Sequence, residues 1–167
     1  MMKKVDIDIT NKCTLKCRMC ARQEYENPKD IPGGNLTVES FQKVLDYFDD
    51  IYFCGSFGDP IFHPKLPRFL EMCYEQNKRV TIHTAASHKP IEWYMEAFYS
   101  NPDAVWYFGI DGLPYQSFVY RENQDGEYLF DVMLKAKSYN IKVVWQYIVF
   151  SYNEDSIEEA KELAKKH

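Results

Sequence analysis

Apolar and polar positions along the chain form two alternating patterns. Short runs of apolar residues, or runs that alternate apolar with polar, predict β-strands, whereas apolar positions three and four residues apart predict helices. The first strand shows the alternation clearly, because Val5, Ile7 and Ile9 are separated by Asp6 and Asp8. The patterns predict strands over residues 5–9, 51–54, 80–84, 104–110 and 141–150, and helices over residues 37–49, 65–76, 91–100, 127–138 and 155–167.

Polar residues mark several ends of these segments. Thr37 stands where an N-cap is expected for the first helix. Asn101 and the proline that follows it close the third helix. Asp155 and Glu158 have the spacing of a capping box, so they predict the start of the last helix.

Strand and helix alternate five times, which predicts an α/β fold with a parallel sheet and helices on its outer face. Each crossover should be right-handed. Five units are too few to close an eight-stranded barrel. We therefore expect a (βα)5 open, partial TIM-like barrel, forming one domain over residues 1–167, with its chemistry at the carboxyl ends of the strands.

Composition narrows the class of protein. Hydrophobic residues make up 46% of the 167 residues, enough for a core without disulfides. Lys and Arg total 20 against 25 Asp and Glu, and this net charge of -5 argues against nucleic acid as a partner. Apolar runs stay far below the ~20 residues of a membrane helix. Asp6 and Asp8 lie where a signal peptide would be apolar, so a cytoplasmic protein is expected.

Three of the five cysteines lie close together, directly after the first predicted strand. Cys13, Cys17 and Cys20 have the spacing C-x3-C-x2-C. In a reducing compartment, such a triplet indicates a metal or cluster site more than disulfides. Three thiolates can bind three irons of a 4Fe-4S cluster, and the fourth iron is then open to a ligand that is not protein.

Zinc is the alternative interpretation of this triplet. Structural zinc sites normally have four Cys or His ligands, so a fourth would have to come from a distant position. Cys54, His63 and His83 are the candidates. Otherwise Cys54 and Cys73 are expected to be small apolar residues of the core, with Cys73 on the buried side of its helix.

The cysteine motif, on the loop after the first strand, resembles the signature of the radical SAM superfamily. The resemblance implies that Cys13, Cys17 and Cys20 bind the cluster, and that the open iron chelates the amino and carboxylate groups of S-adenosylmethionine (SAM). In that family, reduction of SAM releases methionine and a 5'-deoxyadenosyl radical, which abstracts hydrogen from the substrate. Met19 would lie beside the adenine.

A second motif follows the second strand. The run Phe57-Gly58-Asp59-Pro60 resembles the family's Gly-Gly-Glu-Pro motif, which holds the methionyl amino group of SAM. Two positions differ, since Phe57 replaces the first glycine and Asp59 replaces the glutamate. Without the resemblance, the same run predicts only a glycine turn before a helix.

Segments after the fourth and fifth strands resemble relatives that carry a SPASM or twitch domain. Asp111 belongs to an Ile-Asp-Gly run, and Arg121 would pair with the carboxylate of SAM, a task that suits a bidentate guanidinium. Asn153 would contact the nucleoside. Their simpler roles are a turn cap for Asp111, a surface position for Arg121 and a helix cap for Asn153. Gln146 is a weaker candidate for the same contact as Asn153. His83 and Thr84 end the third strand and should point into the mouth of the sheet, although a lone strand histidine is more often a core residue than a ligand.

The chain departs from typical relatives in having no sixth βα unit and no C-terminal auxiliary cluster domain. A homodimer, a partner chain or further chain is expected to cover the open edge of the sheet. The leading hypothesis is a radical SAM enzyme or its catalytic core, with a one-electron donor such as flavodoxin or ferredoxin and an unknown substrate, for which a peptide is the first candidate. The alternatives are a non-catalytic iron-sulfur subunit and a zinc-binding interaction module.

Overall fold

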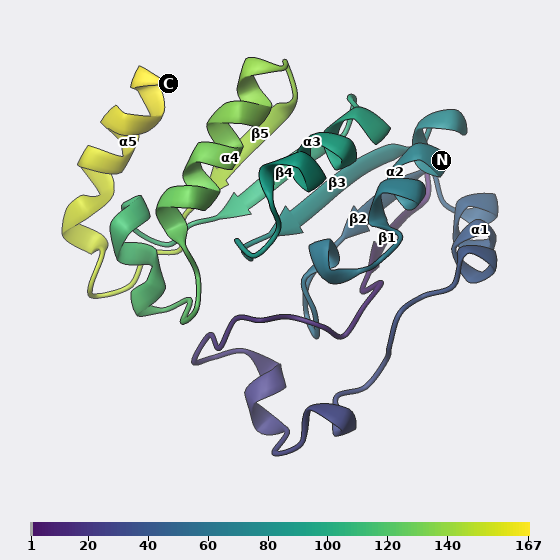
Figure 1. Cartoon of the computed structure of the whole chain (residues 1–167), viewed down its shortest axis with the longest axis horizontal. Coiled ribbons are helices and arrows are strands. Elements are labelled where there is room, and N and C mark those ends of the chain that lie inside the picture. The colour runs from purple at the N-terminus through teal and green to yellow at the C-terminus, as the bar shows by residue number, and fades with distance from the viewer. Residues whose placement is uncertain (1) are drawn as a thin grey trace.

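The computed structural model describes residues 2–167, which form a five-stranded parallel sheet in the order β1-β2-β3-β4-β5. The strands lie side by side in chain order, so each helical crossover joins neighbours (Figure 1). Their bounds are β1 (Lys4–Ile7), β2 (Asp50–Phe53), β3 (Arg79–Thr84), β4 (Val105–Gly109) and β5 (Lys142–Gln146).

Five α-helices accompany the strands: α1 (Val38–Tyr47), α2 (Leu66–Glu75), α3 (Ile91–Ser100), α4 (Gly126–Ser138) and α5 (Ile157–Lys166). Helices α2, α3 and α4 form a layer over one face of the sheet, and α5 lies at the β5 edge (Figure 1). Short 3-10 helices fill the loops at Ala21–Glu24, Pro28–Asp30, Pro60–Phe62, Pro114–Val119 and Glu154–Ser156. In the described part of the chain, no helix is long and apolar enough to cross a membrane.

The two faces of the sheet differ in chemistry. One row across the sheet is Ile7, Phe53, Ile82, Trp106 and Val143. The middle three of these side chains are fully buried in the core. The adjacent row, Asp6, Tyr52, Thr81, Val105 and Lys142, points to the opposite face, because side chains alternate along a strand. The apolar face packs against the helices, and the other face is largely polar.

All ten predicted strands and helices exist; α3 has the predicted bounds, and the bounds of the other nine are shifted. The predicted strand 141–150 is too long, since β5 ends at Gln146 and the chain then turns. That turn is closed by Asn153, whose side chain accepts a hydrogen bond from Phe150 N and donates one to Ile148 O. Tertiary hydrogen bonds therefore end the strand within an apolar run.

The N-cap prediction is confirmed at one helix and wrong at another. Thr37 caps α1, because its side chain accepts a hydrogen bond from Ser40 N at 3.1 Å. The Asp155–Glu158 capping box does not form. Asp155 lies instead within the 3-10 helix Glu154–Ser156, and α5 begins only at Ile157, with Ser156 as a cap that makes no side-chain bond.

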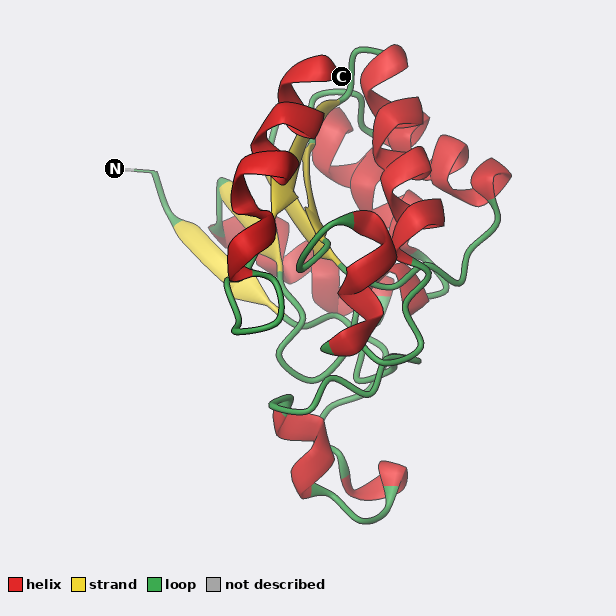
Figure 2. Cartoon of the chain, turned by 90° about the vertical axis from the view of Figure 1, so that its left-hand side faces the viewer, coloured by secondary structure: helices red, strands yellow, loops and turns green. Residues whose placement is uncertain are grey.

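The segment between β1 and α1 carries the three cysteines. It extends beyond the carboxyl ends of the strands and away from the helical layer, as both views show (Figures 1 and 2). Its main chain returns to the sheet through a hydrogen bond from Leu36 N to Ile9 O at 2.8 Å. The cysteine loop is therefore held next to the ends of the strands.

Candidate cofactor site

A cavity of about 360 Å³ lies at the carboxyl ends of the strands. All three cysteines of the triplet line it, together with residues from the ends of the other four strands. The lining residues are Cys13, Leu15, Cys17, Met19, Cys20, Ala21, Arg22, Gly55, Ser56, Gly58, Asp59, His83, Thr84, Ala85, Gly109, Tyr120, Arg121, Gln146 and Ile148. The fold thus brings together segments that are more than a hundred residues apart.

The cysteine triplet is organised by its own main chain. Cys20 N donates to Cys17 O at 3.0 Å, and Leu15 N donates to the Cys13 sulfur at 3.4 Å. Cys17 is buried and the other two are half-buried, and all three are free thiols. The turns point several thiols of a short segment toward one cavity.

Contacts with two other loops hold the cysteine segment in place. Lys16 N donates to Glu122 O at 3.1 Å, and the Asn123 side chain donates to Thr14 O at 3.1 Å. Thr14 Oγ1 also lies 2.9 Å from His88 Nδ1, beyond the end of β3. The position of the thiols therefore depends on residues from the loops after β3 and β4.

Gly58 is required by the close approach of two loops. A Cβ at this position would lie 2.2 Å from Thr10 O and 2.8 Å from Lys12 N. The next residue, Asp59, donates its backbone N–H to Lys12 O at 2.9 Å. The glycine therefore lets the β2 loop lie directly against the start of the cysteine segment.

The Asp59 carboxylate faces the interior of the protein. It accepts hydrogen bonds from Thr84 Oγ1, Ala85 N and Ala86 N, and from Ile61 N of its own loop. Burial raises the pKa of Asp59, and these four donors oppose that effect. The carboxylate thereby joins the β2 loop to the end of β3, and its lone pairs are already used.

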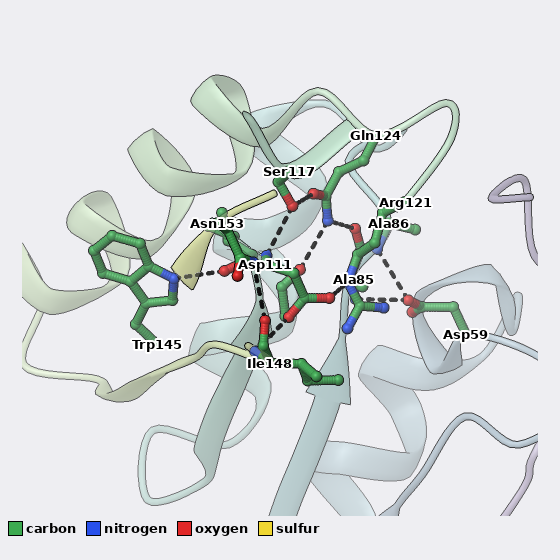
Figure 3. Close-up of polar contacts among 12 residues, drawn as sticks. Asp59, Ala85, Ala86, Asp111, Ser117, Arg121, Gln124, Trp145, Ile148 and Asn153 are labelled. Carbon is green, nitrogen blue, oxygen red and sulfur yellow. Dashed lines mark hydrogen bonds and ion pairs between the residues drawn. The ribbon is translucent and has the colours of Figure 1, made fainter. Parts of the chain in front are cut away.

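Arg121 and Asp111 form an ion pair at the cavity wall, with 2.7 Å between Arg121 Nε and Asp111 Oδ2 (Figure 3). The Asp111 side chain is fully buried, and its other oxygen accepts a hydrogen bond from Ile148 N at 2.8 Å. Gly109 leaves room for the guanidinium, because a Cβ there would lie 2.9 Å from Arg121 Nη2. The pair fixes the guanidinium while its terminal nitrogens remain beside the cavity.

Ser117 and Gln124 complete the polar network in Figure 3. Ser117 Oγ accepts from Asp111 N at 2.8 Å and donates to the side chain of Gln124. Gln124 in turn donates to Ala85 O and Gly109 O. This buried network joins the ends of β3 and β4 to the start of α4.

The predicted site residues divide into two groups. Cys13, Cys17, Cys20, Met19, Gly58, Asp59 and Arg121 line the cavity. The other three predicted residues do not line the cavity. The Phe57 ring packs edge-on against Tyr25, with 6.3 Å between the ring centroids. Asp111 and Asn153 are fully buried. Asn153 uses its side chain to close the turn after β5, and it makes no side-chain cap for a helix.

Of the three distant zinc candidates, only His83 lines the cavity with the cysteine triplet; His63 and Cys54 do not. His63 is buried, with Nε2 3.0 Å from Leu36 O and Nδ1 accepting from Lys65 N at 3.1 Å, so both ring nitrogens are occupied. Cys54 is half-buried and does not line the cavity. His83 does line it and stacks on Tyr107 with ring centroids 4.6 Å apart. Cys73 is fully buried on α2, as predicted.

Several lining residues had no signal in the sequence. Tyr120 and Ile148 lie in segments that resemble the family but had no role of their own, and Arg22 follows the triplet by only two residues. Ser117 and Gln124 act behind the cavity wall, through main-chain contacts that no local spacing reveals. Proximity of Arg22 to the cysteines was the one signal that could have been used.

The donor atoms of the three thiols fit an iron-sulfur cluster. No group of three His, Cys, Asp or Glu side chains among residues 2–167 is close enough to bind one metal ion. The thiolates of a cluster bind different irons and are accordingly further apart, and sulfur is the donor that such clusters take. Burial and the nearby Asp59 charge raise the pKa of Cys13 to about 12, and burial raises that of Cys17. Metal binding would therefore displace protons.

A comparison with protein families finds the Radical SAM superfamily over residues 7–164. The tungsten-containing aldehyde ferredoxin oxidoreductase cofactor-modifying protein of Pyrococcus furiosus is 34% identical over 122 residues, which cover 68% of this chain and 32% of that protein. The chain therefore spans about a third of this curated relative's length.

Solved structures share the fold. Native anSMEcpe with bound AdoMet matches 99% of this chain and 49% of its own, with a TM-score of 0.74 and 16% identity. SuiB of Streptococcus suis bound to S-adenosylmethionine matches 96% of this chain and 37% of its own, with a TM-score of 0.74 and 14% identity. Methylornithine synthase (PylB) matches with a TM-score of 0.61 and 13% identity, over 87% of this chain and 44% of its own. The predicted α/β partial-barrel fold is thereby confirmed.

Proposed function

The chain belongs to the radical SAM superfamily, and from that membership we propose that it binds a 4Fe-4S cluster through Cys13, Cys17 and Cys20 and SAM in the adjoining cavity. Bound together, the two cofactors supply the reductive cleavage of SAM that begins radical chemistry on a substrate. The observation that carries the proposal is the presence of three free thiols and an arginine on the wall of one cavity.

Arg121 is proposed to bind the carboxylate of SAM. Its Nε is already paired with Asp111, so the orientation of the guanidinium is set before any ligand arrives. The terminal nitrogens lie over Gly109, beside the cavity. A fixed guanidinium loses little conformational entropy when it binds a carboxylate, which favours tight and oriented binding.

Asp59 and Gly58 support the SAM site indirectly in this proposal. Asp59 accepts four hydrogen bonds from protein groups, so it fixes the main chain at Ala85 and Ala86 and contributes its charge. Met19 is 82% exposed at the rim, where a flexible thioether side chain can cover an adenine ring. Asp111, Asn153 and Phe57 act through the loops that they hold.

The substrate, the electron donor and the partner that covers the sheet edge are proposed for the whole protein, whose relatives are two to three times as long as this chain. SuiB has been solved bound to its precursor peptide SuiA, and the Pyrococcus furiosus relative is named for modifying a cofactor. A peptide remains the first candidate substrate. A flavodoxin or ferredoxin in the cytoplasm would supply the electron.

Iron and acid-labile sulfide content after anaerobic reconstitution tests the cluster. We expect about four irons per chain, the content of one 4Fe-4S cluster. Cys13→Ala, Cys17→Ala and Cys20→Ala should each lose most of this iron. Cys54→Ala is the matched control, because Cys54 is a free thiol of similar burial outside the cavity, and it should keep the iron.

Formation of 5'-deoxyadenosine separates an enzyme from a non-catalytic iron-sulfur subunit. With dithionite and SAM, the reconstituted chain should produce it above the rate without protein. Arg121→Gln should raise the Kd for SAM about tenfold, the loss expected for one charge-assisted pair. Stoichiometric zinc without sulfide would instead support the zinc-binding module.

A further inference from the structure

Arg22 lies directly beside the cysteine triplet. It belongs to the 3-10 helix Ala21–Glu24, which begins immediately after Cys20 and is held by a hydrogen bond from Gln23 N to Cys20 O at 2.8 Å. Its side chain lines the cavity that contains the three thiols. It also lines a second cavity of about 300 Å³, whose wall likewise includes Cys13. The guanidinium is therefore placed between two hollows, next to a proposed cluster ligand.

Arg22 is the arginine without an anionic partner in the described part of the chain. The other four each pair with a carboxylate: Arg18 with Glu122, Arg68 with Glu71, Arg79 with Asp50 and Arg121 with Asp111. The Nε of Arg22 is completely buried and has no hydrogen-bond acceptor. Removing part of a guanidinium from water without an acceptor is costly, so the site is built for a negative charge.

The charged side chains near Cys13 indicate that this negative charge is that of the proposed cluster. Arg22 and Cys13 line the same two cavities, so the guanidinium lies close to this thiol. The Asp59 carboxylate, which also lines the first cavity, is already occupied by four hydrogen bonds. Arg121, on the Cys17 side, is largely compensated by Asp111 at 2.7 Å. Arg22 is therefore the uncompensated positive charge on the wall that carries the thiols.

We propose that Arg22 stabilises the reduced state of the cluster by placing its positive charge beside Cys13. Reduction adds one electron, taken from the external donor, to a cluster whose three thiolates already make it anionic. A nearby fixed cation lowers the free energy of the more negative state. This inference rests on the proposed cluster site and adds a residue that sets its reduction potential.

A redox titration of the reconstituted protein, followed by EPR, tests the inference. Arg22→Gln should decrease the equilibrium constant for reduction on the order of tenfold, which is about 59 mV toward more negative potential for a one-electron couple. Arg22→Lys retains the charge and should stay within about threefold of the parent. Arg18→Gln is the matched control, because its side chain is 72% exposed and paired with Glu122, and it should not shift the potential.

Each outcome decides the inference. An unchanged potential in Arg22→Gln, or an equal shift in Arg22→Lys, would overturn it. If Arg22→Gln and Arg22→Met both fail to hold a cluster while Arg22→Lys holds one, the charge is needed to bind the oxidised cluster, and the assignment of Arg22 to the reduced state would be overturned. Failure of all three would overturn it, since local shape would then decide. Absence of a cluster in the parent protein would instead contradict the proposed function.

Discussion

Gly58 allows two loops of the site to pack directly against each other. The β2 loop passes so close to the cysteine segment that a methyl group at position 58 would overlap Thr10 O. The glycine of this motif is thus explained by packing between two loops. A ligand is not needed to account for it.

Gly58→Ala should lower the free energy of unfolding by about 2 kcal/mol, because either loop must move to accommodate the new Cβ. Gly34→Ala is the control, since no atom lies within 4 Å of its Cβ position. That change should alter stability by less than about 0.5 kcal/mol. Urea denaturation measures both, and equal effects would show that the close approach does not exist.

His63 predicts a dependence of stability on pH. Its Nδ1 accepts from Lys65 N, so the ring is neutral in the folded protein, and burial lowers its pKa from 6.5. The unfolded chain therefore binds the proton more tightly, and stability decreases as pH falls below about 6.5. The loss from this group should grow as the pH falls from about 7.5 to about 5.5, through the range in which the unfolded chain takes up the proton.

His63→Gln removes that contribution and should flatten the curve of unfolding free energy against pH. Glutamine can still donate to Leu36 O, which limits the structural cost. Denaturant titrations at several pH values give the comparison. A variant whose curve keeps the parent's slope would rule out the neutral, buried ring.

Individual residues were predictable from sequence, but their pairings were not. The sequence indicates both Asp111 and Arg121, yet their ion pair depends on how the chain after the 3-10 helix Pro114–Val119 places Arg121 over Gly109. Asp59 lines the cavity, but the hydrogen bonds that its carboxylate accepts from Ala85 N and Ala86 N have no counterpart in the sequence pattern. Spacing along a chain does not indicate which polar groups another loop will occupy.

Among the elements, α1 has the clearest cap. Thr37→Ala removes the hydrogen bond to Ser40 N and should lower the free energy of unfolding by about 1 kcal/mol. Thr37→Ser keeps the hydroxyl and should stay within about 0.5 kcal/mol of the parent. Thermal and urea unfolding would detect this difference, and equal losses in the two variants would contradict the capping role.

Local patterns identified the strands and helices but not all of their ends. The apolar run 141–150 continues past Gln146, and only the side chain of Asn153 reveals that residues 147–150 form a turn. At α5, the acidic residues at 155 and 158 matched a capping box, but a 3-10 turn precedes the helix. Periodicity reports which face is buried, whereas ends depend on contacts with other elements.

Across the whole molecule, the network of Ser117 and Gln124 holds the loops around the cavity together. Gln124→Ala would leave Ala85 O and Gly109 O without a donor inside the protein. The expected loss is about 2–4 kcal/mol, since buried polar groups become unsatisfied. Gln42→Ala, which removes exposed hydrogen bonds with Asp46 and Gln76, should cost less than about 0.5 kcal/mol.

Amide hydrogen exchange shows whether Gln124→Ala loosens the strand ends at the cavity or destabilises the whole protein evenly. In Gln124→Ala, amides at the ends of β3 and β4 should lose more protection than the drop in the free energy of unfolding accounts for. Amides of α1 should lose no more than that drop. Uniform loss of protection, with no excess at these strand ends, would show that Gln124 does not hold the cavity wall.

The site as a whole could be located from the order of the strands, because parallel strands end at one edge of the sheet. The cavity boundary could not, since it depends on how the segment 8–37 folds back and where Arg22 and Ile148 point. The central claim concerns what this cavity binds.

EPR of the anaerobically reconstituted and reduced protein, with and without SAM, tests that claim most directly. The account predicts a 4Fe-4S signal that changes when SAM is added, because SAM would bind the iron that has no cysteine ligand. A signal that is the same with and without SAM would contradict a SAM site at the thiols of Cys13, Cys17 and Cys20.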